Sequence, residues 1–154
     1  MDLARLRFGD WVMALGGVAV LGAMLADWYA VPVLGEQVGF NAWESFAVND
    51  VILAVAAVMA LTTFVLTATQ PAAAVPLALA SLTTLAALLG LVLVVIRMIW
   101  PPDLTDGVLD VSREGGAWLG LVATSALLAG CLASIRDERM PQPEQPVEPR
   151  LVRL

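Results

Sequence analysis

Long apolar runs, separated by short polar segments, make up most of the chain. The runs lie between Asp10 and Asp27, between Asp50 and Gln70, between Pro71 and Arg97, and from Gly115 to Ile135. A helix that crosses the hydrocarbon core of a bilayer needs about 20 apolar residues. The pattern therefore predicts four membrane-spanning helices, at about residues 8–29, 50–69, 75–99 and 115–135.

The first run is the shortest and reaches a spanning length only if Phe8, Trp28 and Tyr29 extend it. Arg5 and Arg7 precede it, as basic residues precede a cleaved signal peptide, but no small-x-small cleavage pattern follows. We therefore expect a retained signal anchor. Residues 1–136 are predicted to form an all-α, up-down-up-down four-helix bundle in the membrane.

The arginines indicate the orientation of the four spans. Six lie on the side of the two termini and two on the other side: Arg5, Arg7, Arg136, Arg139, Arg150 and Arg153 against Arg97 and Arg113. Basic residues concentrate on the cytoplasmic side of membrane proteins, so both termini are predicted to be cytoplasmic. On the cytoplasmic side, six acidic residues balance the six arginines. On the external side, eight acidic residues face two arginines, so the whole formal charge of -6 lies on the external face.

Composition supports a membrane protein and excludes several activities. Hydrophobic residues make up 60% of the chain and charged residues 14%, against about 25% charged residues in ordinary soluble domains. The chain has no Lys and no His, so it lacks a Schiff-base lysine, imidazole ligands for haem or zinc, and a His general base. The single Cys131 cannot form a redox pair. We expect no enzyme activity, cofactor, metal or nucleic-acid partner.

The first external segment, about residues 30–49, has two parts. Val31, Val33 and Val38 flank a Gly-Glu-Gln turn, which favours a small hairpin. Asn41 followed by Glu44 is typical of a capping box, which predicts a short helix at 42–48 lying on the membrane. Trp43 and Phe46 of that helix are expected to press into the bilayer.

Arg97 is the one charged residue within the third apolar run. A charge inside a bilayer is costly unless it has a partner or reaches the surface. We expect Arg97 to pair with Asp50, or failing that with Asp27 or Glu44; the alternative is that Arg97 extends to the lipid headgroups.

Aromatic residues gather at the predicted outer boundary. With one acid they form a candidate external interaction face, composed of Trp28, Tyr29, Trp43, Glu44, Phe46, Trp100 and Trp118. The alternative is an interfacial belt, in which such rings settle at headgroup depth. Asp103, Asp106 and Asp110 lack the spacing of a calcium loop and are expected to form a solvated acidic loop.

Small residues recur along the fourth predicted helix, at Gly116, Gly120, Ala123 and Gly130. Small residues let helices approach closely in lipid, so this stripe is a candidate packing surface, either inside the bundle or between copies of the chain. The other polar residues within the runs are mainly Ser and Thr, which we expect to act as structural hydrogen-bonding groups. No acid or base lies near a midplane, which disfavours proton relays and ion-coupled transport.

The last segment, residues 137–154, is a Pro-rich cytoplasmic tail. Pro143, Pro146 and Pro149 recur every three residues, as along one edge of a polyproline II helix. The tail is either a docking peptide or a disordered end.

Four short segments resemble a family of small bacterial four-pass membrane proteins of unknown function. They are Asp27-Trp28-Tyr29, Asn41 to Val48 with Asp50, Gly116-Ala117-Trp118-Leu119, and Arg136-Asp137-Glu138-Arg139. The resemblance spans about residues 1–139 and implies architecture, not an activity. The tryptophan-bearing first loop on four helices is also similar to the claudin arrangement, although the cysteine pair of that loop is missing here.

We therefore expect a non-enzymatic scaffold or accessory subunit of a membrane complex. Its acidic, aromatic external face would engage another membrane protein or a second copy. The alternative is a small oligomeric pore or a transporter of lipid or another hydrophobic molecule.

Overall fold

The computed structural model describes residues 6–46, 48–69, 74–104 and 110–138. The chain is mostly helical. Its elements are α1 (Phe8–Ala23), β1 (Asp27–Val33), β2 (Glu36–Asn41), α2 (Ala42–Ser45), α3 (Asn49–Thr69), α4 (Ala74–Ile99), β3 (Ser112–Arg113) and α5 (Gly115–Glu138). Of the sequence predictions, the Pro-rich tail from residue 139 onward and Asp106 lie outside the described residues.

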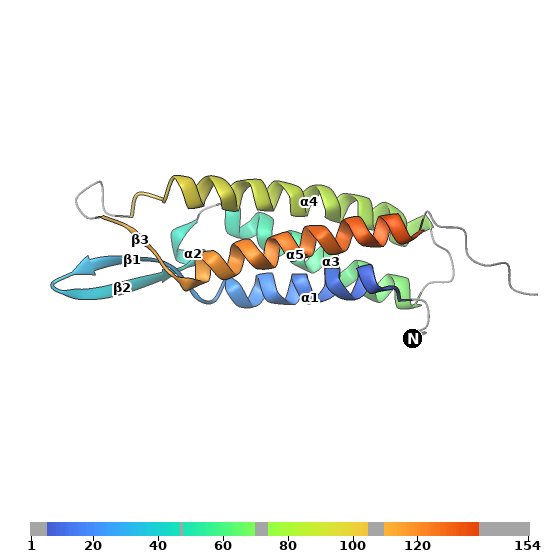
Figure 1. Cartoon of the computed structure of the whole chain (residues 1–154), viewed down its shortest axis with the longest axis horizontal. Coiled ribbons are helices and arrows are strands. Elements are labelled where there is room, and N and C mark those ends of the chain that lie inside the picture. The colour runs from blue at the N-terminus through green and yellow to red at the C-terminus, as the bar shows by residue number, and fades with distance from the viewer. Residues whose placement is uncertain (1–5, 47, 70–73, 105–109, 139–154) are drawn as a thin grey trace, which may run out of the picture.

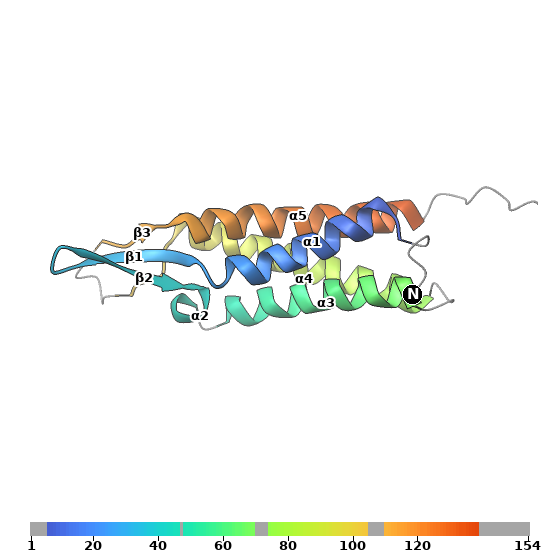
Figure 2. The same cartoon turned by 90° about the horizontal axis from the view of Figure 1, so that it is seen from below.

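The four long helices lie side by side, and the strands lie beyond one end of them (Figures 1 and 2). α1 packs against α3 and α5, and α4 packs against the same two helices. Each long helix runs in the opposite direction to the long helix before it (Figure 1). Three helices are long and apolar enough to cross a membrane: Asn49–Thr69, Leu77–Ile99 and Gly115–Asp137.

The first helix ends earlier than predicted. α1 stops at Ala23, after 16 residues, and does not continue to residue 29. Tight backbone bonds close its last turn, from the Leu25 N–H to the Gly22 carbonyl and from the Ala26 N–H to the Ala23 carbonyl. Trp28 and Tyr29 then enter strand β1, where their aromatic side chains suit extended backbone.

A three-stranded antiparallel sheet in the order β2-β1-β3 makes the all-α prediction incomplete. The predicted hairpin is present and consists of β1 and β2, but Glu36 and Gln37, which were predicted in its turn, lie in β2. The two-residue turn consists of Leu34 and Gly35, both with positive φ. The third strand comes from the α4–α5 connection and pairs with Tyr29 and Ala30.

The capping box of the short helix α2 is present as predicted. The Glu44 N–H donates to Asn41 Oδ1 at 3.1 Å, and the Asn41 N–H donates to Glu44 Oε2 at 3.0 Å. The helix ends at Ser45, however, and not at residue 48. Phe46 adopts extended backbone, and its ring is buried in the core instead of facing outward as predicted.

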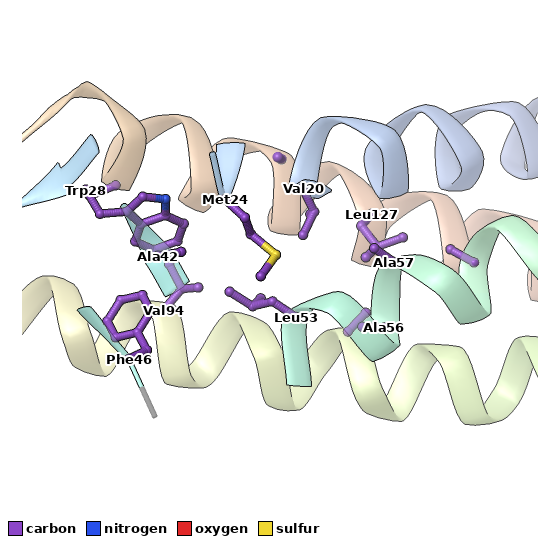
Figure 3. Packing of buried hydrophobic residues seen from close by; sticks show 14 of the residues in the cluster. Val20, Met24, Trp28, Ala42, Phe46, Leu53, Ala56, Ala57, Val94 and Leu127 are labelled. Atoms are coloured by element: carbon purple, nitrogen blue, oxygen red, sulfur yellow. The ribbon is translucent and has the colours of Figure 1, made fainter. Parts of the chain in front are cut away.

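The core continues from the bundle into the sheet end without a break (Figure 3). Val20, Met24 and Leu127 fill the space between the helices, and Trp28 and Phe46 close it at the sheet end. The bundle and the sheet therefore share one hydrophobic core.

The predicted small-residue stripe of α5 faces the inside of the molecule. A Cβ at Gly130 would collide with the Met13 backbone of α1, and one at Gly9 would collide with the backbone of Ser134. Here the α1 and α5 backbones touch almost directly. Buried Asp10 accepts from the Ser134 hydroxyl at 2.5 Å and fixes this contact at the end remote from the sheet.

The Ser and Thr hydroxyls of the apolar helices form hydrogen bonds within and between helices, as expected. Most donate to a carbonyl one turn earlier; Thr124, for example, donates to the Gly120 carbonyl at 2.6 Å. Thr63 of α3 and Thr83 of α4 lie 3.3 Å apart, oxygen to oxygen, and link these two helices.

Candidate docking site at the sheet end

Trp28 anchors the hairpin to the bundle. The β1–β2 register shifts between Asp27 and Tyr29, which forms a bulge at Trp28. Trp28 and Tyr29 are both buried, and so are Ala30 and Val31 after them, so the base of β1 is covered on both faces. The Trp28 Nε1–H donates to the carbonyl of Ala23, the last residue of α1, at 2.7 Å.

Glycines of α5 make room for this indole. A Cβ at Gly120 would collide with the Trp28 ring, and one at Gly116 would collide with the Asp27 backbone carbonyl. Ala123, two turns from Gly116, is buried with them. The predicted Gly116–Gly120 motif therefore packs against β1 within the chain.

Side chains of the sheet donate hydrogen bonds to the last backbone carbonyls of α4. The Tyr29 hydroxyl donates to the Arg97 carbonyl at 3.0 Å, and Arg113 Nε donates to the Met98 carbonyl at 2.6 Å. Helix C-termini leave four carbonyls without intrahelical partners. Burial raises the pKa of the Tyr29 hydroxyl above its ordinary value, whereas the positive charges of Arg97 and Arg113 act to lower it.

Phe46 completes an aromatic anchor, which we define as Trp28, Tyr29 and Phe46. Its ring meets Trp28 edge-on at a centroid distance of 5.3 Å and Tyr29 edge-on at 5.9 Å. The Arg97 guanidinium lies over the same ring, 5.8 Å from its centroid, within the range of a cation–π interaction.

Arg97 and Asp50, both in the described part of the chain, are not joined by an ion pair. The Asp50 carboxylate is buried and accepts from the adjacent Val51 N–H at 2.8 Å. Leu53 lies against Gly90, so Asp50 lies about one helical turn deeper than Arg97. The Phe46 ring is level with Arg97 and provides the contact that we had expected from a carboxylate.

The predicted external face divides into buried and exposed residues. Trp28, Tyr29 and Phe46 belong to the core and are not available at the surface. Trp43, Trp100 and Trp118 are exposed, and Glu44 is exposed while its carboxylate caps α2.

The hairpin tip, which we define as Val33, Leu34 and Val38, is an exposed apolar surface that the sequence did not reveal. Leu34 is fully exposed, and about two-fifths of the surface of Val33 and of Val38 is exposed. Leu34 also has a φ of 52°, a left-handed conformation that costs about 1–2 kcal/mol for most residues other than Gly. The only available signal was the Leu-Gly pair, where such turns prefer Asn-Gly.

Within the described residues, no group of three or more His, Cys, Asp or Glu side chains is placed to hold a metal ion. No protein-family model, no curated protein and no solved structure matches the chain. Its function is therefore argued from its own residues and geometry.

Proposed function

We propose that the chain is a non-enzymatic integral membrane protein of the bacterial plasma membrane, with four spans and both termini in the cytoplasm. It acts as a scaffold or accessory subunit and engages another membrane protein through its sheet end. The observation that carries this proposal is the hairpin, which is fixed rigidly at its base while its apolar tip stays exposed.

The outward surface of the bundle supports a membrane environment. Leu15, Val58, Leu85 and Val122, one on each long helix, are all exposed apolar side chains. In water such a surface would be an aggregation hazard, whereas lipid solvates it. The three helices of spanning length have the same implication.

Exposed aromatic residues mark two levels that fit the bilayer boundaries. Phe8 and Trp11 lie at the end remote from the sheet, and Trp118 lies at the sheet end. Since Met13 lies against Gly130, Trp11 is level with Leu132, which is 14 residues from Trp118 and so about 21 Å along the axis. The 16-residue helix α1 spans about 24 Å. Both lengths are shorter than the roughly 30 Å of a typical hydrocarbon core, and local thinning of the bilayer would accommodate the difference.

Co-purification from native membranes tests the scaffold role. The full chain, carrying an affinity tag, is crosslinked in membranes of the source cell, and its size in native-lipid nanodiscs is measured. One stable partner at a fixed ratio supports a scaffold. Recovery of the chain alone under all conditions contradicts it.

A groove between α1 and α5 supports a second candidate function, the binding or transport of lipid. Its volume is about 420 Å³, and its walls include Gly16, Ala19 and Gly22 of α1 and Leu119, Val122 and Ala126 of α5. These apolar walls suit one acyl chain of the bilayer. If the purified protein retains one lipid species per chain, and Ala126→Leu abolishes this retention, the lipid-handling function is supported. A ring-shaped oligomer with a hydrated central axis would instead support an oligomeric pore.

A further inference from the structure

No described residue pairs with the outer edge of β2, which we call the open edge. β2 is the end strand in the order β2-β1-β3. Val33 and Glu36 flank the two-residue turn, so their backbone N–H and C=O groups form hydrogen bonds with each other. Hydrogen-bonded and non-hydrogen-bonded pairs alternate along an antiparallel ladder, so Val31 and Val38 form the next hydrogen-bonded pair. Gln37 and Gly39 belong to the non-hydrogen-bonded pairs, so their N–H and C=O groups point away from β1.

The opposite edge of the sheet is closed. The Glu114 N–H donates to the Trp28 carbonyl at 2.9 Å, and Ser112 pairs with Ala30, so β3 covers the base of β1. Nearer the tip Pro32, which pairs with Gln37 across the ladder, has no N–H to offer on that side. Natural sheets protect exposed edges in these ways, and β2 has no Pro among its residues.

The open edge adjoins the apolar hairpin tip. Val31 pairs with Val38, and Val33 pairs with Glu36; paired residues share a face, so Val33 and Val38 are diagonal neighbours on one face. Leu34 extends this surface in its unfavourable left-handed conformation. An open edge, an exposed apolar face and a strained exposed Leu thus coincide within seven residues.

Carboxylates surround this edge. Glu36 lies next to the turn, Glu44 follows β2, and the Asp27 carboxylate lies where a Cβ of Gly39 would be. The described arginines of this end are engaged at the base, Arg97 over the Phe46 ring and Arg113 on carbonyls of α4. The edge therefore complements a positively charged partner.

The geometry points to strand addition: an extended, basic segment of a partner protein pairs with the edge of β2 at Gln37 and Gly39. Its apolar side chains lie on the face of Val33 and Val38, and its Lys or Arg side chains lie on the opposite face, where the Asp27 carboxylate lies beside Gly39. Main-chain bonds would give affinity and alternate side chains would give specificity, as in other sheet-edge complexes. This inference rests on the proposed scaffold function and adds the mode of contact.

A second copy of the chain fits the edge less well. The hairpin strands run roughly along the bundle axis (Figures 1 and 2). Antiparallel pairing of two β2 edges would make the two bundles point in opposite directions, which is incompatible with one membrane in one orientation. A separate extended segment has no such constraint.

Peptide binding to two matched variants tests the inference. The probe is a fluorescent nine-residue peptide of alternating Val and Lys, added to the full chain in zwitterionic nanodiscs. Gln37→Pro removes the edge N–H but no bond to β1, whereas Gln37→Thr keeps that N–H. We expect Gln37→Pro to weaken binding roughly tenfold, the value of one ladder bond, and Gln37→Thr to change it less than twofold. Circular dichroism verifies that both variants fold.

Four outcomes overturn strand addition, the last of them observed by co-purification. The first is equal binding of the Pro and Thr variants, and the second is equal binding of the same peptide with N-methylated amides. The third is dimerisation of the chain that is lost in Gln37→Pro, which would assign the edge to a second copy. If a native partner co-purifies equally with both variants, the scaffold proposal stands while strand addition fails; if no partner co-purifies with the wild type, the scaffold proposal itself fails.

Discussion

At its base the β1–β2 hairpin buries Trp28 and Tyr29 almost completely, whereas at its tip Leu34 is fully exposed. The base gives each polar side-chain group a partner: the indole N–H and the phenol hydroxyl donate to helix carbonyls. The tip makes no comparable contact among the described residues and keeps Leu34 in a left-handed turn. The aromatic anchor thus stabilises the hairpin, whereas the left-handed Leu34 at the tip lowers its stability.

Replacing the central anchor residue is expected to have the largest effect. Trp28→Ala removes a fully buried indole and leaves the Ala23 carbonyl without its donor, so we expect a loss of about 3–5 kcal/mol in the free energy of unfolding. The matched control is Trp43→Ala, because Trp43 is half-exposed. This substitution should change the free energy of unfolding by less than about 0.5 kcal/mol. Equal losses in a denaturation titration in detergent would remove the distinction between the two tryptophans.

Filling the space beside the indole should have the next largest effect. A Cβ from Gly120→Ala collides with the Trp28 ring, whereas Gly22→Ala meets nothing within 4 Å. We expect Gly120→Ala to destabilise by about 1–3 kcal/mol through overpacking and Gly22→Ala to be neutral or stabilising, because Ala favours helix. Thermal unfolding of both variants in one detergent checks this; a stabilised Gly120→Ala would show that the anchor is loosely packed.

Tyr29 is the only tyrosine, so alkaline absorbance titration reports the anchor alone. Because burial raises its folded pKa above the ordinary 10.0, the anchor contributes stability that is full below pH 10 and is lost as pH rises through the folded pKa. The midpoint should lie above 10 in the folded protein and return to about 10 in denaturant. Tyr29→Phe should abolish the signal and cost about 0.5–1.5 kcal/mol. A folded midpoint at or below 10 would mean that water reaches the hydroxyl.

Relieving the tip should have the smallest effect, and of opposite sign. Asn adopts the left-handed region more readily than Leu, so Leu34→Asn should stabilise the fold by roughly 1 kcal/mol while it weakens binding of the Val-Lys peptide. Leu34→Val, a β-branched residue that fits this conformation poorly, is the control and should destabilise. If Leu34→Asn destabilises instead, Leu34 has a structural contact at the tip and is not held there for a partner.

The sequence predicted the last three long helices closely because hydrophobic length alone determines them. The expected ranges 50–69, 75–99 and 115–135 correspond to Asn49–Thr69, Ala74–Ile99 and Gly115–Glu138. The capping box at Asn41 and Glu44 was also predictable, since it is a local signal four residues long.

The fate of the aromatic residues depends on contacts far along the chain. Trp28 fits either an interfacial belt or a core, and it is buried because Gly116 and Gly120, about 90 residues later, leave space for its ring. Strand β3 has only two residues, and it is held in place by its pairing with β1 and by the hydrogen bond from the Glu114 N–H to the Trp28 carbonyl. For Arg97, the position of the Phe46 ring determines the partner, and no spacing in the sequence encodes that position.

Cysteine labelling of two hairpin residues tests the contrast between base and tip most directly. In a Cys131→Ala background, Val31→Cys and Leu34→Cys place thiols three residues apart, the first at a buried and the second at a fully exposed position. A membrane-impermeant maleimide is added to intact spheroplasts and, separately, to denatured protein. We predict rapid labelling of Leu34→Cys from outside, protection of Val31→Cys until denaturation, and equal labelling of both afterwards. Equal labelling of both in spheroplasts, or labelling of Leu34→Cys only after lysis, would contradict an external hairpin that is fixed at its base and free at its tip.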